Sequence, residues 1–170
     1  MKVEVAQSSR LVFHPYVASM VPKYHSWMQD EELLRLTGSE PLTLEEEVLN
    51  RQSWVEDPMK CTFILCDKAV FIEESPEQSM IGDLNLFLNE TASGEVNIMI
   101  AEASYRRKGL AREALQFIVE FAKKLGLNRL EAKIQTDNTS SISLFLSLGF
   151  TQYAEEPAFN EVHMELSLFN

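Results

Sequence analysis

The amino-acid sequence predicts an α/β fold: one domain, residues 1–170, built on a mixed β-sheet with helices on its faces. The chain has 170 residues, of which 45% are hydrophobic, and this is enough for one domain with a buried core. Apolar residues recur with a helical period in some segments and alternate with polar residues in others. These segments follow the order strand, two helices, three strands, helix, strand, helix and two strands, which is typical of helices packed on a sheet.

The first third of the chain is expected to hold one strand and two helices. Residues 9–17 are expected to form the opening strand. A helix is expected over residues 20–36, where apolar side chains recur at helical intervals. A second helix is expected to begin at Thr43, because Thr43 and Glu46 have the spacing of a capping box, and to end near Asp57.

The middle of the chain predicts three strands. Residues 61–67 are apolar almost throughout, as in a buried strand. A polar loop that contains a proline follows at residues 73–79. Residues 81–88 and 95–101 alternate apolar and polar positions on either side of a turn, so they are expected to form an antiparallel hairpin.

The last third is expected to alternate helix and strand. Residues 110–125 carry one apolar stripe that ends at Gly126, and this indicates the strongest helix of the chain. Residues 130–135 alternate as a strand does, and a short helix is expected over residues 142–148. The chain is expected to close with a hairpin formed by residues 150–153 and 162–168.

Composition and charge exclude several classes of protein. The formal charge of −11 disfavours nucleic acid and anionic membranes as partners. No apolar run reaches the roughly 18 residues of a membrane-spanning helix, and the first residues lack the apolar core of a signal peptide. Cys61 and Cys66 lie in one apolar strand without histidines at ligand spacing, so we expect no metal, no thiol nucleophile and no disulfide. The expectation is a cytoplasmic protein, either a monomer or a homodimer.

A basic segment interrupts the acidic chain. Residues 101–133 carry eight of the fifteen basic side chains and only four acidic ones. Here an apolar strand leads into the turn R-R-K-G at residues 106–109 and then directly into the amphipathic helix. A helix start offers unpaired N–H groups and a partial positive charge, and the small Gly109 and Ala111 let a phosphate approach. The segment fits a diphosphate; a charged helix face without a ligand is the alternative.

Two motifs resemble a known family. The sequence R-x-x-G-x-A, from Arg106 through Gly109 to Ala111, follows an apolar strand and opens a helix. The sequence N-T-S-S-I-S-L-F-L-S-L-G-F runs from Asn138 to Phe150. Together they resemble the acetyl-CoA pyrophosphate loop and the N-x-x-S…G-F segment of the GNAT acetyltransferase superfamily, in its ribosomal-protein alanine acetyltransferase branch.

Further segments are similar to the N-acetyltransferase 9-like family more closely still. They are Y-H-S-W-M, S-E-P-L-T-L-E-E-E, K-C-T-F-I and G-D-L-N-L-F-L, so the resemblance extends from Leu11 to Leu168. It implies the GNAT acyl-CoA N-acyltransferase fold, β-α-α-β-β-β-α-β-α-β-β with splayed central strands. It also implies acetyl-CoA as the acetyl donor.

The resemblance implies which residues hold acetyl-CoA. The backbone of residues 98–100 would pair with the pantetheine arm as an added strand would. The N–H groups of residues 107–112 would hold the pyrophosphate, and Asn138 would hydrogen-bond the arm. The full expected set is Ile98, Met99, Ile100, Arg106, Arg107, Lys108, Gly109, Leu110, Ala111, Arg112, Asn138, Ser141 and Phe145.

The resemblance also implies that an acceptor amine attacks the thioester directly. Glu95, at the start of the strand that enters the site, is the first candidate for the base, and Glu40 is the second. Many GNAT enzymes have a tyrosine where this chain has Phe145, so Ser141 is the expected acid that protonates the departing thiolate. The residues expected to bind the acceptor are His25, Glu40 and Asp83.

The expected acceptor is a primary amine of a protein or peptide N-terminus. An α-amine has a reference pKa near 7.7–8.0, against about 10.4 for lysine, so it loses its proton more easily. Acidic residues of the first two helices would attract its positive charge; these are Glu31, Glu32, Glu40, Glu45 and Glu46. Two alternatives stay open: a small amine such as a polyamine or an aminoglycoside, and a CoA-binding module that recognises a partner without turnover.

Overall fold

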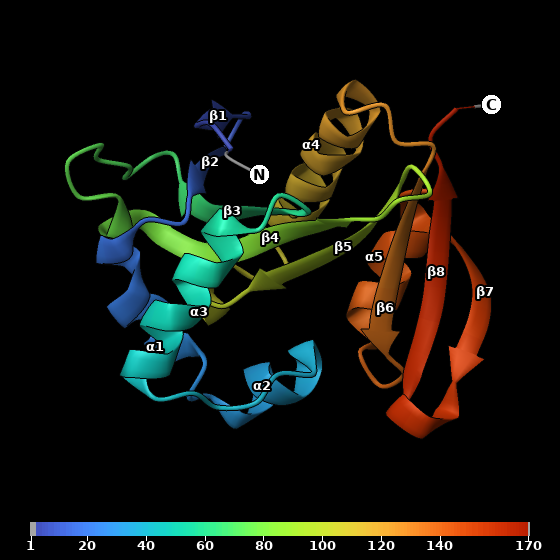
Figure 1. Ribbon diagram of the computed structural model, residues 1–170, viewed down its shortest axis with the longest axis horizontal. Helices are drawn as coiled ribbons and strands as arrows, with labels where there is room; N and C mark the ends of the chain where they lie inside the picture. Colours follow the sequence, from blue (N-terminus) through green and yellow to red (C-terminus); the bar gives the residue numbers. More distant parts are fainter. Residues whose placement is uncertain (1–2, 170) are drawn as a thin grey trace.

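The computed structural model describes residues 3–169, which form one eight-stranded sheet with helices on both faces (Figure 1). The strands are β1 (Ala6–Gln7), β2 (Leu11–Pro15), β3 (Lys60–Asp67), β4 (Met80–Leu88), β5 (Ser93–Ile100), β6 (Arg129–Gln135), β7 (Thr151–Glu156) and β8 (Glu161–Ser167). Their order in the sheet is β1-β2-β3-β4-β5-β6-β8-β7. Neighbouring strands are antiparallel except β5 and β6, which are parallel.

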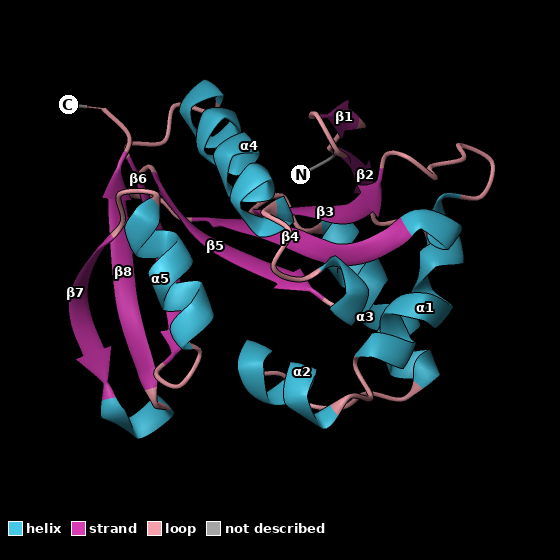
Figure 2. Cartoon of the chain, turned by 180° about the vertical axis from the view of Figure 1, so that it is seen from behind, coloured by secondary structure: helices cyan, strands magenta, loops and turns pink. Residues whose placement is uncertain are grey.

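The helices form a layer on each face of the sheet. In the described part of the chain the α-helices are α1 (Val21–Trp27), α2 (Glu31–Thr37), α3 (Leu44–Glu56), α4 (Leu110–Lys124) and α5 (Thr139–Ser147), and there are also four short 3-10 helices. α4 and α5 pack on one face, and α1, α2 and α3 lie on the other (Figure 2). In β3, Phe63 and Leu65 face the first layer whereas Ile64 and Cys66 face the second. The strand is apolar throughout because both of its faces are covered.

Several local sequence predictions are confirmed. Thr43 caps α3: its hydroxyl accepts the N–H of Glu46 at 3.2 Å, and the Glu46 carboxylate accepts the N–H of Thr43 at 2.7 Å. The hairpin of β4 and β5 and the hairpin of β7 and β8 are both present. α4 buries its apolar stripe, and Gly126 follows its end in a left-handed conformation.

The prediction of one helix over residues 20–36 is wrong, because the structure divides this segment between α1 and α2. Asp30 causes the break: its carboxylate accepts the backbone N–H groups of Glu32 and Leu33 at 2.9 and 3.0 Å and so caps a new helix. The apolar spacing continues across this break, which is why periodicity alone joined the two helices. The two-residue strand β1 was also not expected, since it is too short to show alternation.

The central strands separate, as the resemblance implied. β5 and β6 pair only over residues 93–95 and 129–131, and beyond this point β5 continues to Ile100 without β6 beside it. The other edge of β5 stays tightly bound to β4. At Gly82 of β4 an added Cβ would lie only 2.0 Å from the carbonyl oxygen of Met99, so this position requires glycine. The last residues of β5 are therefore held firmly on one side and open on the other.

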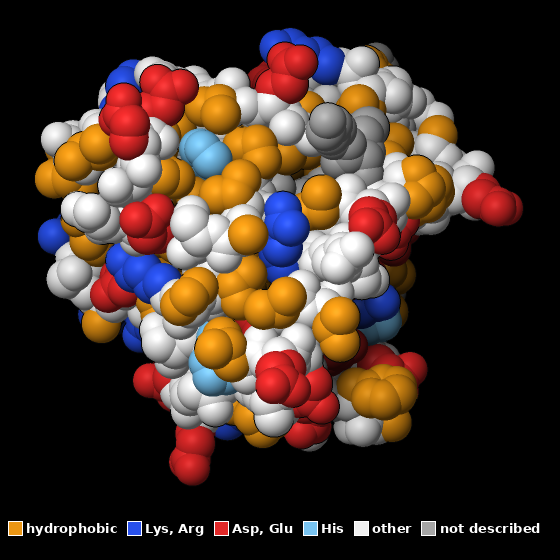
Figure 3. All heavy atoms as spheres, turned by 60° about the vertical axis from the view of Figure 1, so that its left-hand side comes forward, with side chains coloured by type: hydrophobic (Ala, Val, Ile, Leu, Met, Phe, Trp, Pro, Cys, Tyr) orange, Lys and Arg blue, Asp and Glu red, His pale blue; other side chains and the backbone are white. Residues whose placement is uncertain are grey.

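The surface carries dispersed acidic groups. On the face shown in Figure 3, acidic side chains are scattered among hydrophobic and uncharged ones instead of forming a single patch. Such dispersal fits a chain whose formal charge of −11 is not confined to one segment. Within residues 3–169, no helix has the combined length and hydropathy that crossing a bilayer requires.

Candidate active site

A cleft of about 510 Å³ lies beside the open edge of β5, beyond the point where β5 and β6 part. It is bordered by the end of β5, the loop and first turn of α4, the start of α5 and one side of α2. Of the residues expected to hold acetyl-CoA, all except Lys108 and Phe145 line it. The wall of this cleft therefore brings together residues that lie between positions 98 and 141 of the sequence.

The start of α4 faces this cleft with its backbone. Gly109 is the N-cap residue, with φ of 79°, and no side chain caps the helix. The first N–H bonded to a helix carbonyl is that of Glu113, which donates to Gly109 at 3.1 Å. The N–H groups of Leu110, Ala111 and Arg112 thus precede the helical hydrogen-bond ladder, and all three residues line the cleft. An uncapped helix start in a hollow is suited to bind an anion.

The arginine side chains around this helix start make different contacts. Arg106 turns back to β5, where it donates from Nε to the Ile100 carbonyl and from Nη2 to the Ala101 carbonyl, each at 2.9 Å. Arg112 donates to the Ser147 hydroxyl at 2.6 Å. Arg107 lines the cleft, and its side chain has no hydrogen-bond partner among residues 3–169. Of the three, Arg107 is thus the one whose guanidinium is open to a phosphate.

The start of α5 forms the opposite wall. Asn138 caps this helix, and its Oδ1 accepts the N–H of Ser141 at 3.3 Å. The Ser141 hydroxyl lines the cleft without a hydrogen-bond partner in the described part of the chain. Two neighbours on the same helix, Ser140 and Leu144, also line the cleft and were not predicted.

α2 supplies the third side of the cleft, which sequence reasoning missed. Leu33, Leu36 and Thr37 line it. An ion pair between Arg35 and Asp137 connects α2 to the loop before α5. The only signal in the sequence was an amphipathic segment, and nothing local indicates that its apolar side lies against a cleft whose other residues come from positions 98 to 144.

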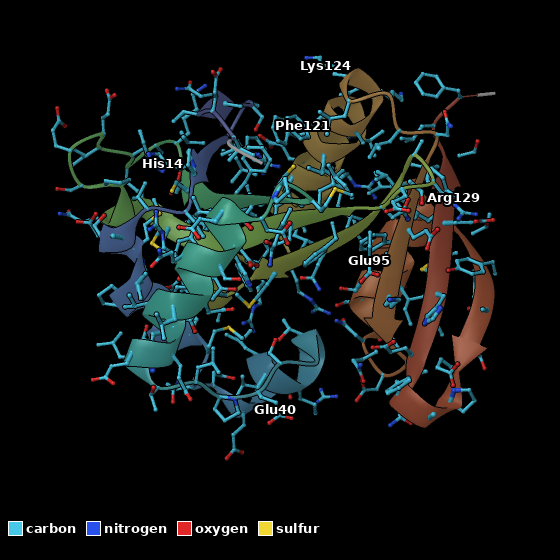
Figure 4. All side chains as sticks on the ribbon, in the orientation of Figure 1. His14, Glu40, Glu95, Phe121, Lys124 and Arg129 are labelled. Atoms are coloured by element: carbon cyan, nitrogen blue, oxygen red, sulfur yellow. The ribbon has the colours of Figure 1, made fainter. Side chains whose placement is uncertain are left out.

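Glu95, the expected base, lies at the vertex between the diverging strands. It is the last residue of β5 that pairs with β6, and Figure 4 shows it where these two strands part. Its carboxylate forms an ion pair with Lys133 of β6 at 2.8 Å. Glu95 does not line the cleft in this structure. The ammonium group of Lys133 therefore occupies one side of this carboxylate.

The residues expected to bind the acceptor do not line the cleft either. His25 lies on α1, with Nε2 2.9 Å from the carbonyl oxygen of Leu42, and Glu40 is exposed on the connection between α2 and α3 (Figure 4). Asp83 is only 3% exposed. Phe145, expected at the cofactor, is 2% exposed and packs edge-to-face on Phe150 in the core, with ring centroids 4.9 Å apart. Phe145 therefore belongs to the core and does not line the cleft in this structure.

Asp83 belongs to a buried polar cluster beneath α1. Its Oδ2 accepts the Tyr24 hydroxyl at 2.9 Å and the Asn85 amide at 2.8 Å, and Asn85 in turn accepts the Thr62 hydroxyl at 2.8 Å. The other oxygen of Asp83 has no hydrogen-bond partner among the described residues. Burial raises the pKa of Asp83 to about 6, although Asn85, Tyr24 and the nearby Lys60 oppose the shift.

This pKa predicts a pH-dependent stability. The folded protein holds the Asp83 proton more tightly than the unfolded chain, so its free energy of unfolding falls as pH rises from about 4 to about 6. Above this range, ionised Asp83 destabilises the fold by about 1–3 kcal/mol. Urea unfolding between pH 4.5 and 7.5 should show this decline in the native protein, and Asp83→Asn should remove it. Parallel stability curves for the two proteins would contradict the assignment.

The two cysteines are unsuited to catalysis. Cys61 and Cys66 are buried and unpaired, and burial raises the pKa of each thiol to about 11. Both are therefore protonated at neutral pH, and a thiol is a poor nucleophile. Neither cysteine is therefore suited to form a covalent thioester with an acetyl group.

Comparison with known proteins identifies the family. Residues 10–151 match the model of the acetyltransferase (GNAT) domain. An α/β-tubulin N-acetyltransferase 9 of Mus musculus is 45% identical over 166 residues, which cover 94% of this chain and 69% of that protein.

The fold resembles spermidine N-acetyltransferase from Vibrio cholerae in complex with CoA and spermine, with a TM-score of 0.81 and 18% identity over 95% of this chain and 97% of the other. It also resembles a ribosomal L7/L12 α-N-protein acetyltransferase in complex with coenzyme A, with a TM-score of 0.79 and 17% identity over 96% and 98%. The motif at the start of α4, the separated strands and these matches together show that the chain belongs to the GNAT acetyltransferase family.

Proposed function

We propose that the protein transfers the acetyl group of acetyl-CoA to the α-amine of a protein or peptide N-terminus. The observation that carries this proposal is the uncapped start of α4, which opens into a cleft beside the free edge of β5. The N–H groups of residues 110–112 are free to receive a diphosphate, and a pantetheine arm fits along the unpaired edge of residues 98–100. When bound, acetyl-CoA supplies the activated acetyl group.

The chain supplies positioning, a proton acceptor and a proton donor. In this proposal the open edge of β5 orients the arm, and Ser141, which lines the same cleft with an unpartnered hydroxyl, is the proton donor to the thiolate. Glu95 is the proposed proton acceptor. Its carboxylate is now paired with Lys133, and an incoming ammonium group can take the place of that partner at the vertex of the two strands. With a reference pKa near 7.7–8.0, an α-amine is partly neutral at physiological pH, so a weak base suffices.

The acceptor class is proposed from the relatives. The mouse relative, which is similar in sequence, is named for tubulin, and one structural neighbour is named for a ribosomal protein. Protein acceptors therefore occur among both the sequence relatives and the structural neighbours. The spermidine enzyme shows that the same fold also accepts a polyamine. We favour a protein acceptor because the relative that is 45% identical in sequence is far closer than the polyamine enzyme at 18%.

A parallel assay separates these acceptors. With acetyl-CoA as donor, the protein should acetylate peptides with a free N-terminus, tubulin N-terminal peptides among them, at least about tenfold faster than spermidine or an aminoglycoside. Mass spectrometry should place the acetyl group on the α-amine. The same peptides with a blocked N-terminus are the control, and any lysine they contain should stay unmodified. Preference for spermidine would assign a polyamine enzyme instead, whereas CoA binding without transfer to any amine would indicate a partner-recognition module.

A further inference from the structure

The turn before β2 contacts the beginning of α4, a hundred residues later in the chain. The Ser8 hydroxyl and the backbone N–H of Arg10 donate to Oε1 of Glu113, at 2.6 and 2.7 Å. The Arg10 guanidinium forms an ion pair with Oε2 of the same carboxylate, at 2.8 Å from Nε. This N-terminal turn is itself fixed by Lys68, which donates to the Ser8 carbonyl at 3.0 Å. Arg10 is thereby held beside the cofactor loop.

Arg10 also reaches the loop directly. Its Nη1 donates to the carbonyl oxygen of Lys108 at 2.6 Å. Arg10 and Lys108 border a second hollow and do not line the cleft, whereas Gly109 does line it. In a trans peptide unit the N–H points opposite to the C=O, and the described chain has no cis peptide. The N–H of Gly109 therefore points away from the Arg10 guanidinium that binds the Lys108 carbonyl, and it has no hydrogen-bond partner among residues 3–169.

We propose that Arg10 is a positioning residue for acetyl-CoA, because its hydrogen bond to the Lys108 carbonyl keeps the Gly109 N–H directed at the diphosphate. This inference rests on the proposed function, since it assumes that the loop binds the diphosphate of CoA. It adds a residue from the N-terminal turn to a site otherwise built from the central strands and α4. It also gives Glu113 a task, namely to hold the guanidinium of Arg10 in place.

The loop needs such a restraint because its backbone is held in an unfavourable conformation. Arg107 has φ of 59° and Gly109 has φ of 79°, on either side of Lys108. The left-handed region costs a residue with a side chain about 1 kcal/mol or more, and glycine adopts either sign of φ readily. Without an external partner for its carbonyl, the peptide between Lys108 and Gly109 can rotate and turn its carbonyl oxygen toward the phosphates. A carbonyl there would repel an anion instead of binding it.

The contribution of Arg10 is orientation and not charge. Its ion pair with Glu113 neutralises it locally, and the carboxylate is held ionised: burial alone would raise the pKa of Glu113, but the hydrogen bonds from Ser8 and Arg10 outweigh burial and lower it. Lysine at position 10 would keep the charge and the ion pair. It has no planar group that can bond Glu113 and the Lys108 carbonyl at the same time.

Isothermal titration of the full chain with CoA tests the proposal. Arg10→Ala should weaken CoA binding about tenfold, which is about 1.4 kcal/mol. Arg10→Lys should stay several-fold weaker than the native protein. The melting temperature without ligand should change by no more than about 3 °C, because the Arg10 side chain is 49% exposed and Glu113 keeps its hydrogen bonds from the Ser8 hydroxyl and the backbone N–H of residue 10. Arg129→Ala is the matched control: its side chain is 47% exposed against 49% for Arg10, and it also pairs with glutamates, but these partners lie on β6 and β8 and not on α4. It should bind CoA as the native protein does.

Dephospho-CoA separates orientation from direct phosphate binding, since it keeps the diphosphate and lacks the 3′-phosphate. The loss in Arg10→Ala should be equal for CoA and dephospho-CoA. A loss confined to CoA would make Arg10 a ligand of the 3′-phosphate and overturn the proposal, as would full rescue by lysine or unchanged affinity in Arg10→Ala. Failure of the native protein to bind CoA would instead refute the proposed function, and this inference with it.

Discussion

Replacing Gly109 with glutamate is expected to abolish CoA binding, with a loss of at least about a hundredfold in affinity. Gly109 has φ of 79°, which strains any residue with a side chain, and an added Cβ would lie 3.3 Å from Nη2 of Arg10. The new carboxylate would also stand at the helix start, where the structure offers its free N–H groups to an anion. It would compete with the diphosphate for them and repel it.

Gly126 provides a matched control at the other end of the same helix. Its φ of 78° is nearly the same, and nothing lies within 4 Å of an added Cβ. Gly126→Glu therefore introduces the same charge and a similar backbone strain without touching the cleft. Titration with CoA should show native affinity for Gly126→Glu and none for Gly109→Glu. Equal losses in the two variants would mean that Gly109 acts through stability and does not belong to a cofactor site.

Ser141→Ala is expected to reduce turnover by about 10- to 100-fold while CoA affinity changes little. The Ser141 hydroxyl lines the cleft and has no hydrogen-bond partner in the described chain, so its removal leaves no buried group unsatisfied. The expected loss is in protonation of the thiolate, which affects kcat and not the binding of CoA. Steady-state kinetics with the preferred peptide, together with titration of CoA, measure the two quantities separately.

Ser140→Ala is the comparison for this variant. Ser140 also lines the cleft in the first turn of α5, but its hydroxyl is directed at Asn138, 3.4 Å away. Its turnover should remain within about twofold of the native rate, because loss of one weak local hydrogen bond is a small change. If Ser140→Ala and Ser141→Ala lose the same activity, or if Ser141→Ala keeps the native rate, Ser141 is not the proton donor.

Much of the fold follows from local physical chemistry. The stripe of α4, the capping box at Thr43 and the hairpin of β4 and β5 all depend on residues a few positions apart, and each was predicted correctly. The break at Asp30 was missed although its cause is equally local. An aspartate inside a segment with continuing apolar periodicity fits either one continuous helix or a new helix that it caps. Only the packed structure decides between these two interpretations.

Some residues of the site could likewise be predicted from local sequence, and others could not. The loop at residues 106–109 and the start of α5 were found because each is one continuous motif, and both line the cleft. Contacts between distant segments could not be predicted from motifs. The wall formed by α2 and the link from Arg10 to Lys108 arise only when separate elements pack together. Phe145 was taken from a family position, and the structure places its side chain in the core and not in the cleft lining, so its contact with acetyl-CoA stays a prediction.

A crystal structure of the protein with bound CoA would show whether the first amides of α4 hold the diphosphate of acetyl-CoA. We expect the diphosphate oxygens to accept hydrogen bonds from the N–H groups of residues 109–112, with the pantetheine arm along residues 98–100. CoA bound with its diphosphate elsewhere, while this turn keeps its amides unoccupied, would contradict the account.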